Sequence, residues 1–396
     1  MSNAQPIASA RTAALLAGAA QWRDRNSHVR IAAREALRDG EWPAQVVELA
    51  LDNVLLDDQV LSEYGNGPDS SGPVVGDCQV ARRDSMLAIL PGNVLGPAIA
   101  TAYCAAAAGA TIMLKSSSRE LCLANIVAEQ FESLGPPIAG TLKTLRWTGG
   151  DEDFESKIFP LASRIIVFGD DATIADVKRR APNNVTVVGY GSAYSLGYVQ
   201  AGSDMAAAAT AAATDVALFD QRGCLSPQTI YVEGDDSKAI LFAHALSGAL
   251  ARVGRALPRG RAGGAEKAAG AEFIRRLMVR ALAPKTHALD TVIVGPDIDG
   301  IPEFVVGAEA FSAPTCAGFG RIVVVKPVHS ASDAAGAAKT LGHRLDSIGV
   351  ASALSPKLRS AFADCGASRL CSLGEMQRPP LGYRPKISDF ALEDSE

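Results

Sequence analysis

Short apolar runs alternate with longer segments of helical pattern along most of the chain. Residues 86–90, 111–115 and 164–168 are mostly aliphatic, and each run precedes a loop rich in glycine, proline, serine or aspartate. Helix-favouring segments such as 98–108 and 120–134 lie between them. This alternation predicts an α/β fold, and strand–helix–strand repeats of this kind are typical of nucleotide-binding sheets.

One segment interrupts this alternation. The chain up to the polar turn at 65–72 is mostly helical in pattern. Residues 73–90 then contain two short strand-like runs separated by a turn near Arg82-Arg83-Asp84. We interpret this segment as a β-hairpin.

Composition excludes several classes of function. Charged residues make up 20% of the chain and the net charge is −5, which argues against a nucleic-acid partner. The seven cysteines form no C-x-x-C pair and no cluster with the five histidines, so we predict no metal site and a reduced, cytoplasmic setting. The apolar run at 12–20 is too short to span a bilayer, and the single basic residue immediately before it disfavours a signal peptide. We therefore expect no membrane span.

The segment from Asp220 to Gln228 is the strongest candidate for chemistry. It places Cys224 on a short turn between a helical run and a strand-like run, with Gly223 beside the sulfur and Pro227 preventing helix continuation. A thiol becomes a useful nucleophile only where its thiolate is stabilised, and Arg222 is close in sequence. The alternative is that Cys224 is an inert core cysteine.

Two earlier polar residues follow strand-like runs. Lys115 ends the run 111–115, and the carboxyl ends of strands in such sheets are where cofactors bind. The alternative for Lys115 is a surface lysine with a buried stem. Asn93 lies in a Gly/Pro-rich loop before a helix, where its amide can donate to an oxyanion or, alternatively, serve as a helix cap or turn residue.

The order of Asn93, Lys115 and Cys224 resembles the aldehyde dehydrogenase superfamily. Within it, the chain resembles the acyl-CoA reductase branch related to the fatty-acid reductase subunit of bacterial bioluminescence systems, from about Gly72 to the C-terminus. The most specific part is the nucleophile signature Asp220-Gln221-x-x-Cys224-x-Ser226-Pro227-Gln228. Further similarity lies in the Pro-x-Asn loop at Pro91-Gly92-Asn93, the cofactor strand at Leu114-Lys115-Ser116-Ser117, the pyrophosphate loop at Phe168-Gly169, and the late Phe-Gly segment at Gly318-Phe319-Gly320.

The resemblance implies a role for each matching position. Cys224 is the expected nucleophile, and the Asn93 amide with the Cys224 backbone N–H is the expected oxyanion site. Cofactor contacts are expected from eight residues: Lys115, Ser117, Ser118, Arg119, Phe168, Gly169, Gly189 and Phe319. Ser118 stands where NAD-preferring relatives often carry a carboxylate, so the resemblance favours NADPH and leaves NADH as the alternative.

The chain also departs from the superfamily pattern. Gly189-Tyr190-Gly191-Ser192 stands where aldehyde-oxidising members carry Glu-Leu-Gly-Gly, so the glutamate that activates water is missing. Ala317 and Gly318 replace the glutamate expected near the nicotinamide ribose. Asp170 and Asp171 follow the pyrophosphate loop. They either repel the pyrophosphate or cap the next helix. The segment 381–385 lacks the His-Asp-Gly of the luminescence reductases, which argues against a long-chain fatty substrate.

The resemblance and the pattern together predict the architecture. We expect a Rossmann-like cofactor domain from residues 1–72 and 91–200, and an α/β catalytic domain from residues 201–375. The hairpin at 73–90 and the tail at 376–396 are expected to pair with a neighbouring subunit, which implies a homodimer or homotetramer.

The predicted function is NAD(P)H-dependent reduction of an acyl-CoA thioester to an aldehyde through a thioester on Cys224. A carrier-protein thioester is an alternative acyl donor, and family resemblance suggests a partner enzyme that supplies activated acyl groups. Two alternatives stay open. One is an acyl-phosphate reductase or CoA-acylating aldehyde dehydrogenase of the same fold, and the other is a non-redox acyl-binding or scaffold protein.

Overall fold

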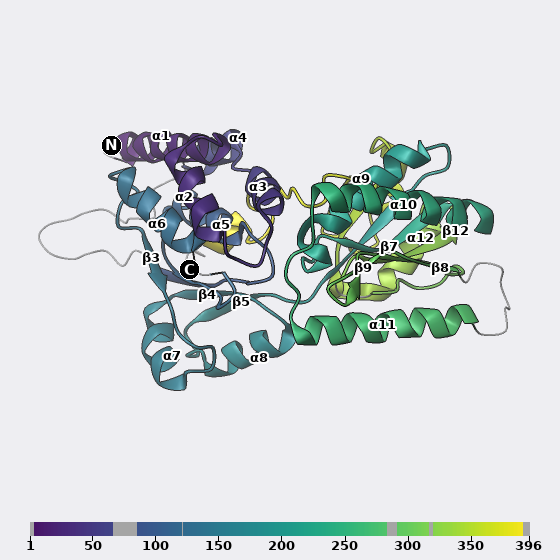
Figure 1. Ribbon diagram of the computed structural model, residues 1–396. Helices are drawn as coiled ribbons and strands as arrows, with labels where there is room; N and C mark the ends of the chain where they lie inside the picture. The colour runs from purple at the N-terminus through teal and green to yellow at the C-terminus, as the bar shows by residue number, and fades with distance from the viewer. Residues whose placement is uncertain (1–3, 66–84, 121, 283–290, 317–319, 391–396) are drawn as a thin grey trace, which may run out of the picture. The chain divides into compact units, whose positions relative to one another are not determined.

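The computed structural model describes residues 4–65, 85–120, 122–282, 291–316 and 320–390 (Figure 1). The chain divides into two compact units, each built on one parallel or mostly parallel sheet. Unit 1 comprises Met1–Gly40, Val47–Ser192 and Arg378–Glu396, and unit 2 comprises Glu41–Val46 and Ala193–Gln377. The predicted α/β fold is confirmed.

The sheet of unit 1 has five parallel strands in the order β3-β2-β1-β4-β5. The strands are β1 (Ser85–Ile89), β2 (Thr111–Lys115), β3 (Leu142–Leu145), β4 (Arg164–Phe168) and β5 (Thr186–Tyr190). Their connections include α5 (Pro97–Ala107), α6 (Leu123–Ser133), α7 (Glu152–Ile158) and α8 (Asp171–Arg180). Strand order reverses between β1 and β4, and ligands of such sheets bind outside the carboxyl ends of the strands at that point.

The predicted hairpin is wrong in its second arm. Residues 85–89 form β1, the central strand of the sheet, which pairs in parallel with β2 and β4. Residues 86–89 are all buried, so both faces of this strand are covered, as in a parallel sheet lined by helices. A hairpin with one solvated face would instead alternate apolar and polar residues. The first arm lies outside the described residues.

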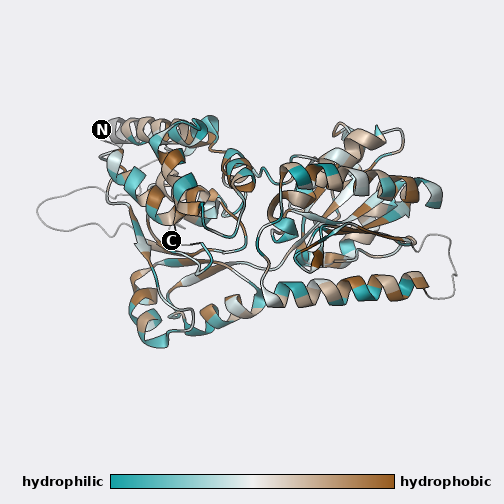
Figure 2. Ribbon diagram, in the orientation of Figure 1, coloured by the Kyte–Doolittle hydropathy of each residue, from teal (hydrophilic) through white to brown (hydrophobic). Residues whose placement is uncertain are grey.

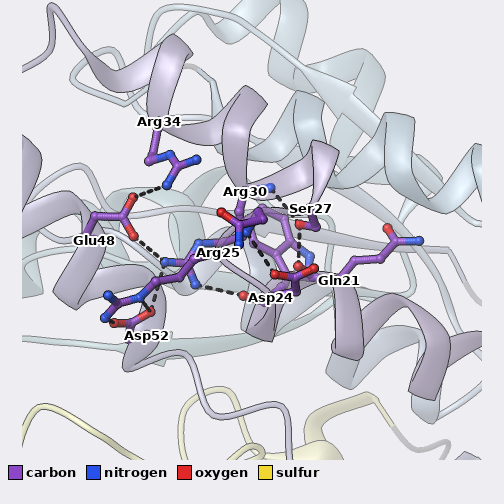
Figure 3. Close-up of polar contacts among 10 residues, drawn as sticks. Gln21, Asp24, Arg25, Ser27, Arg30, Arg34, Glu48 and Asp52 are labelled. Carbon is purple, nitrogen blue, oxygen red and sulfur yellow. Dashed lines mark hydrogen bonds and ion pairs between the residues drawn. The ribbon is translucent and has the colours of Figure 1, made fainter.

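Four helices precede β1 in the chain: α1 (Ala4–Arg23), α2 (His28–Leu37), α3 (Ala44–Asp52) and α4 (Asp58–Gly65). The buried guanidinium of Arg30 ties three of them together (Figure 3). It donates to the Trp22 carbonyl at 2.8 Å and pairs with Glu48 at 2.7 Å and Asp52 at 2.9 Å. A buried cation is tolerated here because carboxylates and a carbonyl replace its hydration.

The described part of the tail packs on its own unit. The short helix η4 (Ile387–Phe390) buries its two apolar ends, with Ile387 6% and Phe390 2% exposed, and contacts α5. Arg164 of β4 donates to the Asp389 carbonyl at 2.5 Å, and the Tyr190 hydroxyl donates to the Asp389 carboxylate. Unit 1 itself covers the apolar side chains of η4, and the pairing of the tail with a neighbouring subunit stays a prediction.

The sheet of unit 2 has seven strands in the order β14-β13-β6-β7-β12-β11-β8, and only β8 is antiparallel to its neighbour. The strands are β6 (Tyr194–Val199), β7 (Pro227–Glu233), β8 (Thr291–Val294), β11 (Val305–Ala308), β12 (Ile322–Val328), β13 (Leu345–Val350) and β14 (Arg369–Ser372). A two-stranded ribbon, β9 (Asp297–Ile298) with β10 (Ile301–Pro302), stands apart. Because β6 belongs to this sheet, the boundary lies after Ser192 and not after residue 200.

Helices cover the sheet of unit 2 on both faces. The helices α9 (Met205–Ala217) and α10 (Asp236–Ala256) share one apolar core with Ile230 and Val323. The helices α12 (Ala331–Ala338) and α13 (Pro356–Phe362) share the other core with Tyr198. Figure 2 shows hydrophobic residues concentrated on the strands, whereas α11 (Gly264–Leu282) carries mixed residues along its length. None of the helices in the described ranges is long and apolar enough to cross a membrane.

Candidate functional site

Most of the predicted cofactor residues gather at one edge of the sheet of unit 1. Asn93 lies in the loop after β1, and Lys115 is the last residue of β2, followed by Ser117, Ser118 and Arg119. Phe168 ends β4, Gly169 follows it, and Gly189 is the penultimate residue of β5. Since all five strands are parallel, these positions share the carboxyl edge where ligands of such sheets bind. Phe319 lies outside the described residues.

The loops after β1 and β2 are packed tightly against each other. A Cβ built on Gly92 would lie 2.1 Å from Ser117 Oγ, so any larger residue here would require Ser117 to move. The Leu90 N–H donates to the Lys115 carbonyl at 3.0 Å, which extends the pairing of the two strands beyond β1. Asn93 and Ser117 are therefore held on loops in contact.

Lys115 lies half-buried beside an aromatic ring. Its ammonium sits 5.5 Å from the centroid of the Trp147 ring. Burial lowers the pKa of Lys115, while the carboxylate of Glu155 acts in the opposite direction. Trp147 itself donates to Glu155 at 2.8 Å. The lysine is thus partly shielded from water at the end of β2, unlike a lysine whose head is fully solvated.

The start of α8 carries its own carboxylate. Asp170 is the N-cap residue and accepts a hydrogen bond from the Thr173 N–H at 2.7 Å. Hydrogen bonds from the Thr173 side chain and backbone lower the pKa of Asp170, so the group is negative at neutral pH. Asp171 adds a second acidic residue in the first turn. The helix-cap alternative is confirmed for Asp170.

The two loop regions differ in how well their side chains suit a nicotinamide dinucleotide. The end of β2 offers a half-buried ammonium at Lys115, a hydroxyl at Ser117 and an exposed guanidinium at Arg119, which suit phosphate groups. The N-terminus of α8 is less suitable, because Asp170 already occupies the Thr173 N–H and repels an anion. The residues present fit the cofactor on the β2 side of the switch point.

Aromatic rings cover the ends of β4 and β5. Phe168 and Tyr190 stack with ring centroids 5.1 Å apart, and Arg384 of the tail lies 5.5 Å from the Tyr190 ring. The Tyr190 hydroxyl also accepts from the Lys386 N–H at 3.0 Å. Phe168 is therefore held by a ring of its own unit. No local sequence signal indicates the contacts of Tyr190 with Arg384 and Lys386, which lie nearly two hundred residues further along the chain.

In unit 2, Cys224 lies half-buried on a tight turn immediately before β7. The Ser226 N–H donates to the Gly223 carbonyl at 3.2 Å, so Cys224 and Leu225 are the central residues of a β-turn. Pro227 begins β7, in agreement with the predicted end of the preceding helix. The turn is the place where the sequence predicted a nucleophile.

The backbone before Cys224 adopts an unusual conformation. Three successive residues other than glycine have left-handed φ angles: Phe219 at 60°, Asp220 at 50° and Gln221 at 61°. Each such residue costs on the order of 1 kcal/mol and persists only where the surroundings enforce it. Nothing in the sequence pattern indicated this run, which we call the left-handed run (219–221).

Hydrogen bonds of two side chains in the left-handed run hold its backbone in this conformation. The Asp220 carboxylate accepts from Arg321 Nε at 2.7 Å and from the Gly260 N–H at 2.9 Å. The Gln221 amide donates to the carbonyls of Pro227 and Ile322, both at 3.0 Å. Both side chains are almost fully buried, so these bonds are not exchanged for water. The turn that carries Cys224 therefore starts from a fixed backbone.

Arg222 has two carboxylate partners. Its guanidinium pairs with Glu41 at 2.7 Å and Glu266 at 3.1 Å, donates to the Arg261 carbonyl, and lies 4.6 Å from the centroid of the Trp42 ring. From the sequence, Arg222 was a candidate to stabilise the Cys224 thiolate. In the structure, the carboxylates of Glu41 and Glu266 compensate its charge. Through Arg261 and Glu266, Arg222 connects the turn to the loop before α11 and to α11 itself.

Sequence reasoning missed Ser195 and Gln377 as partners of the turn. Ser195, fully buried at the start of β6, donates through Oγ to the Cys224 carbonyl at 2.7 Å and accepts from the Ser347 N–H at 3.2 Å. On the other side, Gln377 donates to Ser226 Oγ at 2.6 Å. These partners are 29 or more residues apart in sequence, and single serines in apolar strands carry no signal of such a role.

Other cysteines show the properties of structural thiols. Burial raises the pKa of Cys104 to about 12 and that of Cys316 and Cys371 to about 11. Such thiols are almost entirely protonated at neutral pH and are poor nucleophiles. Over the ranges that the structure describes, no group of three His, Cys, Asp or Glu side chains is arranged to hold a metal ion.

Comparison with known proteins identifies the family and the fold of the chain. Residues 79–384 match the acyl-CoA reductase (LuxC) family. A long-chain acyl-protein thioester reductase from Aliivibrio fischeri is 30% identical over 200 residues, which are 49% of this chain and 41% of that protein. A similar reductase from Photobacterium leiognathi is 26% identical over 199 residues, again 41% of its length. The chain thus matches only about two fifths of these curated relatives.

Solved structures extend the likeness to the whole fold. An NAD-dependent benzaldehyde dehydrogenase from Corynebacterium glutamicum aligns with a TM-score of 0.74 over 98% of this chain and 84% of its own, at 18% identity. An aldehyde dehydrogenase from Pseudomonas aeruginosa aligns with a TM-score of 0.71 over 93% of this chain and 77% of its own, at 16% identity. The fold is that of the aldehyde dehydrogenases, and with more than half of its length matched by the family, the chain belongs to the acyl-CoA reductase (LuxC) family.

Proposed function

We propose that this protein reduces an acyl thioester to an aldehyde through a covalent thioester on Cys224. The observation that carries the proposal is the turn at Gly223–Ser226, which holds a half-buried cysteine on an enforced backbone in a member of the acyl-CoA reductase family. Enforced geometry of this kind is typical of reacting groups.

The first half of the reaction needs only the thiol and hydrogen-bond donors. The Cys224 thiolate adds to the carbonyl carbon of the substrate, the new carbon–sulfur bond forms, and the old carbon–sulfur bond breaks to release the thiolate of CoA or of a carrier protein. One thioester replaces another, so this exchange is close to thermoneutral. The Cys224 N–H and, by resemblance to the superfamily, the Asn93 amide stabilise the negative oxygen of the tetrahedral intermediate.

The second half needs a reductant. A reduced nicotinamide cofactor, when bound, supplies the hydride that converts the Cys224 thioester into the aldehyde. We expect Lys115, Ser117 and Arg119 to hold its phosphate groups. Because Ser118 is exposed at that edge and carries no charge, we favour NADPH, and NADH is the alternative.

Reduction requires that water does not reach the acyl-enzyme first. At position 189, where aldehyde-oxidising relatives carry the base that activates water, the chain has glycine. A Cβ on Gly189 would lie 2.6 Å from an Ile174 methyl carbon, so a larger side chain does not fit there without displacing Ile174. Lack of this base supports an enzyme that preserves its thioester.

The acyl donor is proposed at the level of its chemistry. A CoA thioester follows from the family description, whereas the curated relatives are named acyl-protein thioester reductases. The thioester carbon is the same in both, so the same thiol serves either donor. A homo-oligomer and an acyl-activating partner enzyme stay predictions.

Intact-protein mass spectrometry tests the proposal without any reductant. The protein is incubated with a panel of acyl-CoAs and with an acylated carrier protein, beside Cys224→Ala and the matched control Cys316→Ala. We expect an acyl adduct on the wild type and on Cys316→Ala, and none on Cys224→Ala. Addition of NADPH or NADH at equal concentration should then release aldehyde and discharge the adduct, which the absorbance of the cofactor follows.

Other outcomes overturn the proposal. An adduct that appears only with acyl phosphate would favour an acyl-phosphate reductase of the same fold. A stable adduct that neither cofactor discharges would favour a non-redox acyl-binding protein, for which the two acidic residues at the start of α8 are a specific argument.

A further inference from the structure

We propose that Ser195 is a positioning residue that fixes the peptide group between Cys224 and Leu225, and thereby the geometry of the nucleophile. The inference rests on the proposed role of Cys224. It concerns a serine outside the nucleophile signature, 29 residues before the cysteine and on a different strand.

The argument starts from the β-turn. In a four-residue turn, the common type I and type II forms differ chiefly by rotation of the central peptide, which changes ψ of the second residue and φ of the third. In the turn 223–226 that central peptide joins Cys224 to Leu225. Leu225 is not among the described residues with positive φ, so the turn is not of type II. The carbonyl of Cys224 takes no part in the hydrogen bond that closes the turn.

Ser195 provides the partner that this carbonyl needs. Its Oγ lies 2.7 Å from the Cys224 oxygen and 3.2 Å from the Ser347 nitrogen. Since the Ser347 N–H donates to Oγ, the hydroxyl proton is left to point at the Cys224 carbonyl. Ser195 is completely buried, so its hydroxyl is shielded from water. The hydroxyl therefore works as a fixed bridge between β13 and the nucleophile turn.

The sheet is irregular on both sides of Ser195. Pairing with β7 shifts register between Ser195 and Leu196, and pairing with β13 shifts register between Leu345 and Ile348. Bulges of this kind interrupt the ladder of backbone bonds and are frequent next to active sites, where they re-aim a side chain. Here the Ser195 hydroxyl bonds two backbone groups at the place where the regular ladder is broken.

Fixing this peptide restricts Cys224 directly. A bound carbonyl fixes ψ of Cys224, and because the peptide is trans it turns the Leu225 N–H to the side opposite Ser195. Without the hydroxyl, this bond no longer opposes rotation of the peptide, so the backbone dipoles beside the sulfur are less well oriented. Reaction rates are very sensitive to small errors in the orientation of groups around a reacting atom.

The test compares variants that separate the hydroxyl from the volume of the side chain. Ser195→Ala removes the hydroxyl, while Ser195→Thr and Ser195→Val form a pair of equal shape of which only Thr retains it. Ser347→Ala is the matched control, because that side chain is also fully buried and bonds to Asp346 at 3.1 Å, while its backbone N–H remains. The readouts are the rate of Cys224 alkylation by iodoacetamide over a range of pH, mapped by mass spectrometry, and kcat and KM.

We expect Ser195→Ala and Ser195→Val to lower both the alkylation rate and kcat by about 10- to 100-fold with little change in KM. Ser195→Thr should recover to within about threefold of the wild type, and Ser347→Ala should be close to it. The Thr and Val variants decide the question even if Ser195→Ala does not fold. Equal rates for Thr and Val, or equal losses in Ser195→Ala and Ser347→Ala, would overturn the proposal.

Failure of this proposal is distinguishable from failure of the proposed function. Alkylation reports on Cys224 without an acyl substrate, whereas acylation reports on the reaction. If alkylation follows the hydroxyl but no acyl donor labels the wild type, the proposed function fails and the role of Ser195 stands. If acyl donors label Ser195→Ala as fast as the wild type, only the role of Ser195 fails.

Discussion

The ion pair between Arg321 and Asp220 should be the main support of the left-handed run (219–221). The two side chains are 1% and 3% exposed, and Arg321 Nε lies 2.7 Å from the Asp220 carboxylate. Replacing Arg321 with methionine removes the cation while retaining most of the buried aliphatic volume. It leaves the Asp220 charge with the Gly260 N–H as its remaining partner among the bonds described above. The backbone of the run then loses the contact that best opposes its return to ordinary φ angles.

The size of the effect follows from the burial of the pair. Removal of one partner of a buried ion pair typically destabilises a protein by about 3–5 kcal/mol, because an uncompensated charge remains. Arg321 Nη1 is buried with no partner among the described residues, so its removal also relieves an unsatisfied donor. We therefore expect a loss of about 3 kcal/mol in the free energy of unfolding for Arg321→Met, at the lower end of the range.

Equilibrium unfolding in urea, followed by tryptophan fluorescence, measures this loss. Trp42 packs edge-on against Phe219 with ring centroids 5.4 Å apart, so its emission reports on the run. The matched control is Arg275→Met in the same unit, because Arg275 is 65% exposed in a surface pair with Glu272. That control should change the free energy of unfolding far less than Arg321→Met, because an exposed ion pair contributes little to stability. The double variant Asp220→Asn/Arg321→Met should cost less than the sum of the two single changes.

A direct comparison of the two arginine variants can refute the reasoning. If Arg321→Met costs no more than Arg275→Met, the run does not depend on the buried pair. Strictly additive losses for Asp220→Asn and Arg321→Met would show that the two side chains act independently, and the enforcement of the run would then have to come from Gln221.

Three further predictions concern the two units separately. Asn93→Ala should lower kcat by about 10²–10³-fold without loss of fold, as measured by acyl-thioester reduction and circular dichroism, because one oxyanion donor is lost; an unchanged kcat would remove Asn93 from the site. Ser118→Glu should weaken NADPH binding more than NADH binding in a fluorescence titration, since the new carboxylate repels a 2′-phosphate; equal weakening would place that phosphate elsewhere. Burial raises the pKa of Asp215 to about 7 against the hydrogen bonds from Gly374 and Met376, so its protonation favours the folded state, and the free energy of unfolding should fall as pH rises from about 4 to 7. Asp215→Asn should flatten that fall in urea unfolding at several pH values, and an unchanged slope would assign the pH dependence to other groups.

The sequence predicts the individual strands better than the order of the strands in the sheet. Buried strands such as 111–115 and 164–168 are recognisable because a parallel strand covered on both faces is a continuous apolar run. The same property led to the error at 85–89, where an apolar run next to a polar turn has the local features of a hairpin arm. Only its pairing with β2 and β4, which lie far along the chain, identifies it as the central strand.

The candidate site divides along the same line. The sequence indicates that Asn93, Lys115 and Cys224 lie at or beside turns that follow or precede strands, and the structure places them there; their roles stay predictions. Asp170 was left with two alternatives, and the choice depended on one hydrogen bond to Thr173. The charge of Arg222 could not be assigned, because its partner Glu41 is 181 residues away. Local chemistry is visible in the sequence, whereas compensation of a charge is a property of the folded chain.

The turn of Cys224 shows why its supports had no local signal. Gln221 forms a hydrogen bond to β12, and Asp220 accepts one from the Gly260 N–H. Ser195 of β6 donates to the Cys224 carbonyl, and Gln377 donates to the Ser226 hydroxyl. Each support comes from a different part of unit 2, so the conformation of the turn depends on the whole sheet being assembled. For the nucleophile that we propose, this means that its backbone is ordered on folding and not on substrate binding.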